Sequence, residues 1–274
     1  MHEGLIDSVV RQLMSGKEAT VYIVRCGAED RCAKVYKDAN KRNFRQASLY
    51  QEGRKNKNSR EARAMAKGTR FGRKAQEEAW QTVEVDSLYR LAAAGVRVPR
   101  PFGFFQGVVL MELLTDADGN VAPRLNDLVL SEGVALAYHA TLIREIVRML
   151  CIGVIHGDLS EFNVLVDRDG PVIIDLPQAV NAAGNNNAAG MLQRDVQNIT
   201  NYFSRFAPSL ASTQYGKEIW ALYESGALHE EVALTGRVAV DDRIADVAGV
   251  LRDIDDVKAE HEARLRYKAA LQER

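Results

Sequence analysis

The 274-residue sequence has no apolar run near the roughly 20 residues that a membrane-spanning helix needs. Its first ten residues, MHEGLIDSVV, contain neither a basic leader nor the apolar block of a signal peptide. Cysteine is scarce, and the spacings of Cys26, Cys32 and Cys151 match no zinc or redox motif. We therefore expect a cytoplasmic protein that has no disulfide and makes no contact with a membrane.

The net charge of −1 conceals a strongly basic segment. Residues 37–74 contain thirteen Lys or Arg against three Asp or Glu, and they hold few large apolar side chains. Such a composition predicts a flexible, solvated insertion rather than part of a core. It is typical of an exposed charged loop, and its charge also suits an anionic partner such as RNA.

The residues before about position 114 predict a small antiparallel sheet with one main helix. Five short segments rich in β-branched or aromatic residues predict strands: Val9–Leu13, Thr20–Cys26, Arg31–Tyr36, Phe102–Phe105 and Val108–Leu113. Apolar residues at helical spacing predict a helix over Ala75–Ala94, which Gly95 ends.

From residue 115 onward the pattern becomes mainly helical. Helices are predicted over Leu136–Ile152 and Gln193–Phe206, and an apolar stripe from Ile244 to Ile254 predicts a charged terminal helix. Residues 181–190, NAAGNNNAAG, predict a loop. The fold class is therefore α+β, with an N-terminal part at 1–114 and a C-terminal part at 115–274.

Two polar motifs adjoin short apolar strands in the second part. HGDLSEFNVLV contains Asp158 and Asn163, and PVIIDLPQAV places Asp175 at the end of a strand. If the strands Val164–Val166 and Val172–Ile174 pair as a hairpin, these three side chains meet. Their oxygens suit a magnesium ion that is also held by substrate phosphates, so the set predicts a phosphoryl-transfer site.

Lys34 lies inside the otherwise apolar strand segment CAKVYK. A buried ammonium is costly unless an anion meets it, although a lysine on an edge strand can also extend to solvent. Glu84, in the predicted helix, is our candidate for the carboxylate partner. A lysine on the third strand that pairs with a helix glutamate is the arrangement by which protein kinases contact ATP phosphates.

Together, SGKEATVYIV, CAKVYK, LMELL, HGDLSEFNVLV and IIDLPQAV resemble the RIO family of atypical protein kinases over nearly the whole chain. The resemblance implies a bilobal protein-kinase-like fold and a serine/threonine kinase or ATPase that uses ATP with Mg²⁺ or Mn²⁺. It implies that Asp158 is the catalytic aspartate, that Asn163 and Asp175 are metal ligands, and that Lys34 and Glu84 position phosphate. It also implies that Asp175 can act as a nucleophile and form an aspartyl-phosphate.

The departures from ordinary protein kinases carry further predictions. The turn SGKEA replaces a glycine-rich loop, so Ser15, Lys17 and backbone amides are expected to meet phosphate oxygens. Met111, Glu112 and Leu114 are the predicted hinge that receives adenine. Gly157 stands where the H-R-D motif has arginine, and no A-P-E motif follows, so we expect no activation-loop switch.

Two other functions remain open at this stage. Aminoglycoside and choline kinases also use an H-G-D-x-x-x-x-N loop, and a scaffold that is switched by ATP or hydrolyses it slowly would keep the same residues. We expect His156 to support the loop and Asp195 to anchor the helix behind it. Family members act on the small ribosomal subunit, so residues 37–74 are also a candidate for ribosome contact or autophosphorylation. The protein substrate is not predicted.

Overall fold

The computed structural model describes residues 5–16, 19–37 and 83–237. All of them belong to one compact unit of the chain, Met1–Val238. The predicted insertion after Lys37, the predicted terminal helix and Lys17 lie outside the described residues. No helix of the described part is long and apolar enough to cross a membrane.

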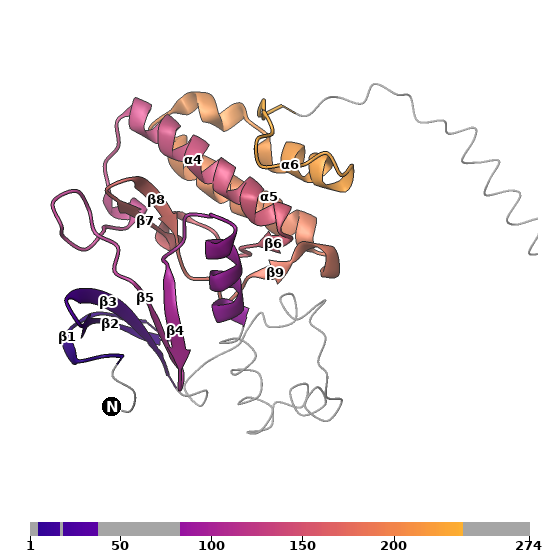
Figure 1. Ribbon diagram of the computed structural model, residues 1–274. Coiled ribbons are helices and arrows are strands. Elements are labelled where there is room, and N and C mark those ends of the chain that lie inside the picture. The colour runs from indigo at the N-terminus through magenta and orange to yellow at the C-terminus, as the bar shows by residue number, and fades with distance from the viewer. Residues whose placement is uncertain (1–4, 17–18, 38–82, 238–274) are drawn as a thin grey trace, which may run out of the picture. The chain divides into compact units, whose positions relative to one another are not determined.

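The N-terminal part is a five-stranded antiparallel sheet with the strand order β1-β2-β3-β5-β4 (Figure 1). Its strands are β1 (Ser8–Ser15), β2 (Ala19–Cys26), β3 (Glu29–Tyr36), β4 (Pro101–Phe105) and β5 (Val108–Glu112). All five predicted strands are found, with ends shifted by up to two residues. The tight turn between β4 and β5 uses Gln106 and Gly107, both with positive φ.

Within the described part of the predicted helix before Gly95, residues 83–93 are helical and Ala94 already belongs to the turn that ends it. Leu88 and Leu91 are buried on its inner face. The helix ends where Val96 N donates to Leu91 O at 3.0 Å, and Gly95 adopts a φ of 72°. That left-handed conformation favours glycine, which explains why the sequence signal for the end of this helix was reliable.

The C-terminal part contains α4 (Glu132–Cys151), α5 (Ala188–Phe203) and α6 (Tyr215–Glu224). Helix α4 starts four residues earlier than predicted because the Ser131 side chain accepts a hydrogen bond from Val134 N and caps it. Helix α6 was not predicted. Short 3₁₀ turns connect these elements: η2 (Leu125–Asp127), η3 (Glu161–Asn163), η4 (Ala182–Gly184) and η5 (Pro208–Ser212).

Two small antiparallel ladders carry the polar motifs. β7 (Val164–Asp167) and β8 (Gly170–Ile173) form the predicted hairpin, with Val164 opposite Ile173. β6 (Val154–Ile155) pairs with β9 (Val180–Asn181), and sequence reasoning missed both strands. The prediction of a loop over 181–190 was therefore partly wrong, because this segment contains the end of β9, η4 and the start of α5.

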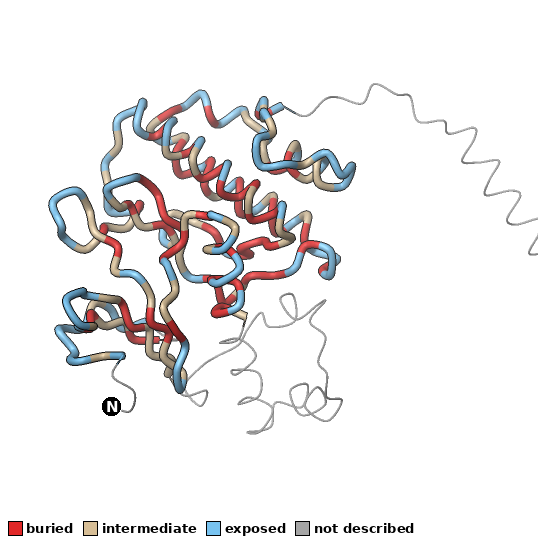
Figure 2. The backbone as a smooth tube through the Cα atoms, in the orientation of Figure 1, coloured by how far each residue is buried: buried red, intermediate tan, exposed pale blue. Residues whose placement is uncertain are grey.

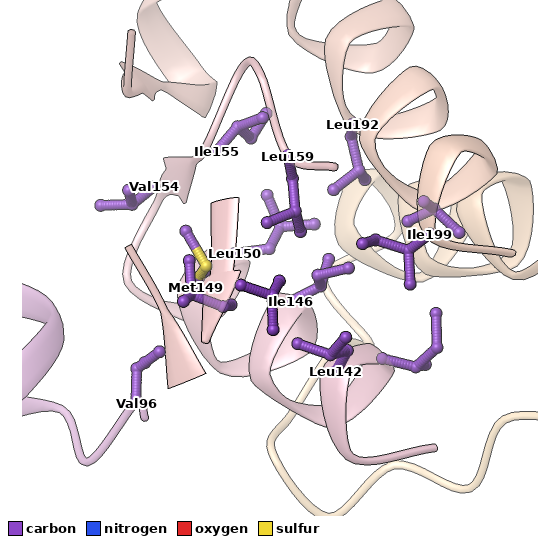
Figure 3. Packing of buried hydrophobic residues seen from close by; sticks show 14 of the residues in the cluster. Val96, Leu142, Ile146, Met149, Leu150, Val154, Ile155, Leu159, Leu192 and Ile199 are labelled. Carbon is purple, nitrogen blue, oxygen red and sulfur yellow. The ribbon is translucent and has the colours of Figure 1, made fainter. Parts of the chain in front are cut away.

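The main hydrophobic core lies between α4, α5 and the small ladders, where the tube of Figure 2 is mostly buried. Figure 3 shows side chains from α4, from β6 and from α5 packed against one another, with Leu159 among them. Leu88 and Leu91, from the helix before the sheet's fourth strand, belong to the same cluster. This shared core fixes the helix and the polar loops to one framework.

A buried histidine in this core makes stability depend on pH. His139 is 2% exposed, shares a 3.0 Å hydrogen bond with Thr200 Oγ1, and burial lowers its pKa to about 4. Below its ordinary pKa of 6.5, the unfolded chain takes up a proton that the folded chain refuses. We therefore expect His139 by itself to lower the free energy of unfolding by about 3 kcal/mol as the pH drops from 6.5 to 4, while the raised pKa of buried Asp195 acts in the opposite direction.

Urea unfolding of the full chain at several pH values measures this loss. In His139→Gln, which keeps a hydrogen-bonding group but does not titrate, the change in unfolding free energy from pH 6.5 to 4 should be about 3 kcal/mol more favourable than in the wild type. An equal dependence in both proteins would contradict the assignment to His139.

Candidate active site

The loop that contains the H-G-D motif follows β6 directly, and side chains of α5 hold its backbone by hydrogen bonds. Leu159 is fully buried in the core. Asp195 Oδ2 accepts from Gly157 N at 2.7 Å, and Asp195 Oδ1 accepts from Leu159 N at 3.1 Å. Asn198 Nδ2 donates to Leu159 O at 3.1 Å. The backbone on either side of Asp158 is therefore clamped by one turn of α5.

Asp195 joins α5 to the H-G-D loop. We expected it to anchor the helix behind the site, and its carboxylate does so by accepting from the backbone of the loop. Asp195 is 1% exposed, and this burial raises its pKa to about 6, although the two N–H donors oppose the rise. Gly157 has a φ of 83°, a conformation that an arginine at this position would rarely adopt.

His156 is buried, and both of its ring nitrogens contact backbone groups near the H-G-D loop. Its Nε2 lies 3.0 Å from Ile174 O, and its Nδ1 accepts from Asp158 N at 3.3 Å. These contacts join the H-G-D loop to the end of the β8 segment. They agree with the supporting role expected for His156.

Asp158 and Asn163 lie on the same turn. Asn163 Nδ2 donates to Asp158 O at 2.9 Å, so the amide oxygen of Asn163 can face a ligand. The carboxylate of Asp158 is exposed, and its Oδ2 accepts from Gln178 Nε2 at 3.0 Å. Partial burial raises the pKa of Asp158, and the nearby charge of Asp175 adds to the rise.

Asp175 follows β8 in a left-handed conformation with a φ of 67°. Ile174 N donates to Asn163 O at 3.0 Å, which brings the backbones before Asp175 and at Asn163 together. Asp175 Oδ1 accepts from Lys34 Nζ at 2.8 Å. Although burial opposes it, the Lys34 ammonium lowers the pKa of Asp175 below its ordinary value.

Lys34 bridges two carboxylates. Its Nζ lies 2.5 Å from Glu84 Oε1 and 2.8 Å from Asp175 Oδ1, and its side chain is 12% exposed. Burial alone lowers the pKa of Lys34, but the two carboxylates more than offset this, and the pKa lies above its ordinary value. The ammonium is thus held charged between the sheet, the helix of residues 83–93 and the segment after β8.

Tyr36 is a member of this cluster that the sequence did not reveal. Its hydroxyl donates to Glu84 Oε2, the oxygen that Lys34 does not use. The Lys34 ammonium also lies 5.6 Å from the centre of the Tyr36 ring. Lys34 and Tyr36 are two residues apart along β3, so the CAKVYK pattern places both side chains on the same face, but it does not identify Glu84 as the partner of Tyr36.

Replacing Tyr36 with phenylalanine should weaken ATP binding. Without the hydroxyl, the Glu84 carboxylate can rotate away from Lys34, and a hydrogen bond to a charged group is worth about 1.5–3 kcal/mol, or roughly tenfold or more in affinity. Calorimetry with Mg·ATP measures the change. Tyr22→Phe, on the neighbouring strand, is the matched control; equal affinities for the two variants would contradict a role for the Tyr36 hydroxyl.

The turn between β1 and β2 is tied to the end of β3. Lys37 Nζ donates to Ser15 Oγ at 2.8 Å and to Gly16 O at 2.6 Å. Ser15 Oγ also lies 3.4 Å from Thr20 Oγ1. The structure therefore places Ser15 in a fixed turn, while the phosphate contact predicted for Ser15 and Lys17 stays a prediction.

The predicted hinge follows the last paired residues of the sheet. Glu112 ends β5 opposite Arg31, and Met111 pairs with Cys32. Leu114 is buried, and its carbonyl accepts from Ala122 N at 3.0 Å. At Leu114 we therefore expect adenine to meet the N–H rather than the carbonyl.

The donor atoms suit a hard divalent cation. Asp158, Asn163 and Asp175 offer carboxylate and amide oxygens from two adjoining backbone segments. Within residues 5–16, 19–37 and 83–237, no group of three or more His, Cys, Asp or Glu side chains is arranged to hold a metal. A set of so few protein ligands fits magnesium, which is commonly held by one or two carboxylates together with substrate phosphates.

Comparison with known proteins identifies the family. The model of the RIO domain matches residues 20–215. The RIO-type serine/threonine-protein kinase Rio1 of Haloferax volcanii is 35% identical over 207 residues, which cover 75% of this chain and 66% of that protein. The serine/threonine-protein kinase rio1 of Schizosaccharomyces pombe is 29% identical over 243 residues, covering 86% of this chain and 46% of that protein.

The matched region thus spans less than two thirds of each of these relatives. Among solved structures, the PK-1 kinase of Cydia pomonella granulovirus is similar with a TM-score of 0.41 and 15% identity, over 64% of this chain and 52% of that one. The expected bilobal α+β fold is confirmed by the antiparallel sheet, the helical part and the domain match. The chain belongs to the RIO family.

Proposed function

We propose that the chain is a RIO-type protein kinase that transfers the γ-phosphoryl group of ATP to serine or threonine hydroxyls. The observation that carries the proposal is the bridge of Lys34 to Glu84 and Asp175, beside a loop that holds Asp158 and Asn163. Phosphoryl transfer depends on positioning and charge stabilisation, and these five side chains supply both. The curated relatives are named serine/threonine-protein kinases, which supports the same reaction.

In this mechanism Lys34 binds phosphate oxygens while Glu84 keeps its ammonium in place. The exposed carboxylate of Asp158 accepts or orients the proton of the acceptor hydroxyl. Asn163 and Asp175 would hold the magnesium ion. When bound, that ion neutralises the phosphate charge and orients the γ-phosphoryl group.

The segment after β5 would receive adenine, through the backbone of Glu112 and the N–H of Leu114, with Met111 behind it. Ser15 and Lys17 would meet phosphate oxygens at the turn before β2. The division into lobes at 1–114 and 115–274, the cytoplasmic location and the use of Mn²⁺ in place of Mg²⁺ are parts of the same proposal.

Radiolabelled ATP tests the proposed reaction against its rivals. The full chain is incubated with Mg²⁺ and dephosphorylated casein, and in parallel with amino alcohols and aminoglycosides. Label on serine or threonine of casein, or of the chain itself, supports the protein kinase. Label only on a small molecule would favour the small-molecule phosphotransferase, and phosphate release with no labelled acceptor would favour an ATP-hydrolysing scaffold. Acid-stable and acid-labile label separate phosphoserine from an aspartyl-phosphate on Asp175.

A second proposal concerns the basic residues 37–74. Their excess of Lys and Arg supports contact with RNA or a ribosomal subunit, because phosphate contacts release counterions. RNA affinity that falls steeply with salt, and is lost when these residues are deleted, is the expected result. Unchanged binding after the deletion would end this proposal.

A further inference from the structure

Gln178 makes an unassigned contact with the proposed catalytic aspartate. Its Nε2 donates to Asp158 Oδ2 at 3.0 Å. Among the residues that the structure describes, this is the one side-chain hydrogen bond that the Asp158 carboxylate accepts. Asp158 itself is exposed, so the packing around it does little to fix the plane of the carboxylate.

The backbone holds Gln178 in a short, buried turn. Ala179 N donates to Leu176 O at 3.0 Å, and both residues, like Pro177, are buried. Immediately afterwards Val180 enters β9 and pairs with Ile155 of β6. Since β6 leads directly into the H-G-D loop, the same two-stranded ladder that positions Asp158 also positions Gln178.

The connection between Asp175 and β9 is short, and within it the side chain of Gln178 contacts Asp158. Residues 176–179 alone separate Asp175, the proposed metal ligand, from β9, so within the described residues 83–237 no long segment lies between Asp175 and this strand. An unsupported aspartate rotates broadly about its last side-chain torsion. A donor fixed on Oδ2 restricts that rotation and leaves Oδ1 for the acceptor hydroxyl.

We propose that Gln178 is a positioning residue for phosphoryl transfer, which keeps the Asp158 carboxylate in the orientation that receives the acceptor hydroxyl. The inference rests on the proposed kinase function and deepens it. Because Gln178 makes this contact in the unmodified chain, the inference requires no phosphorylated segment to orient Asp158.

Three substitutions separate positioning from simple support of the fold. Gln178→Ala removes the donor, and Gln178→Asn keeps an amide that is one methylene too short to reach. Gln178→Glu keeps the shape but places a second carboxylate against Asp158. We expect kcat for casein phosphorylation to fall about tenfold in the first two and about a hundredfold in Gln178→Glu, while KM for ATP stays within about twofold.

Asn181→Ala is the matched control. Asn181 lies three residues further along the same segment, and its side chain accepts from Ala183 N at 3.0 Å instead of contacting the catalytic loop. We expect its kcat to stay near that of the wild type. Thermal melts and Mg·ATP calorimetry of every variant check that the fold and the nucleotide site are intact.

Each remaining outcome overturns the inference in a recognisable way. Values of kcat within about twofold of the wild type in Gln178→Ala and Gln178→Glu would exclude positioning through this hydrogen bond. Equal losses in Asn181→Ala, or losses confined to KM for ATP, would assign Gln178 a merely structural role. A wild-type chain that labels serine or threonine neither in casein nor in itself would remove the proposed function, and the inference with it.

Discussion

Replacing Asp158 with asparagine should reduce phosphoryl transfer by about a hundredfold to ten thousandfold while leaving ATP binding nearly intact. The amide keeps the shape of the side chain but cannot accept a proton from the acceptor hydroxyl. The loop should not move, because it is held through backbone groups of its neighbours by Asp195 and Asn198. Steady-state transfer of label to casein measures kcat, and calorimetry measures the affinity for Mg·ATP.

Asp169→Asn is the matched control for this substitution. Asp169 is exposed in the turn of the hairpin between β7 and β8, and it contacts none of the proposed catalytic groups. We expect its kcat and affinity to equal those of the wild type. If Asp158→Asn retained wild-type kcat, the acceptor hydroxyl would have to lose its proton to another group, and the role given to Asp158 would be wrong.

The sequence was most informative where chemistry and periodicity coincide. Lys34 was recognisable because an ammonium interrupts an apolar strand, and a strand's two-residue period fixes the face to which it points. The hairpin of β7 and β8 was recognisable because two apolar strands flank a short polar turn. These signals lie within single segments of the sequence, so they can be recognised without knowledge of the tertiary structure.

The features that the sequence did not predict are of two kinds: strands too short to show a period, and contacts between residues far apart in the sequence. β6 and β9 have two residues each, which is too few to show any period. Gln178 reaches Asp158 across 20 positions, and Tyr36 reaches Glu84 across 48. Contacts of this kind depend on how the ladders and helices pack, and no spacing rule within one segment can reveal them.

The sequence also misjudged the segment of residues 181–190, whose repeated asparagines favour loops. Within it, Asn181 Oδ1 accepts from Ala183 N, and Asn185 Oδ1 accepts from Asn187 N. These asparagines form successive local turns that lead from β9 into α5. The segment thus connects β9 to α5, and it is Asp195 of that helix, not these asparagines, that contacts the H-G-D loop.

Replacing Asp175 with asparagine should abolish the dependence of nucleotide binding on magnesium, and transfer with it. The carboxylate is the proposed ligand with the lowered pKa, so it is ionised well below neutral pH and available to a cation. We expect the affinity for Mg·ATP to fall about a hundredfold and kcat to fall by about three orders of magnitude. Calorimetry in Mg²⁺ and in EDTA measures the two affinities separately.

The binding of ATP in EDTA distinguishes a lost metal ligand from a damaged site. In the wild type, the ammonium of Lys34 forms ion pairs with both Glu84 and Asp175. Asp175→Asn removes one negative charge next to the phosphates and leaves Lys34 paired with Glu84, so affinity for metal-free ATP should stay the same or rise. A parallel loss in Mg²⁺ and in EDTA would show that Asp175 supports Lys34 rather than the cation. The metal would then have to be held without Asp175, and the ligand set proposed for it would be wrong.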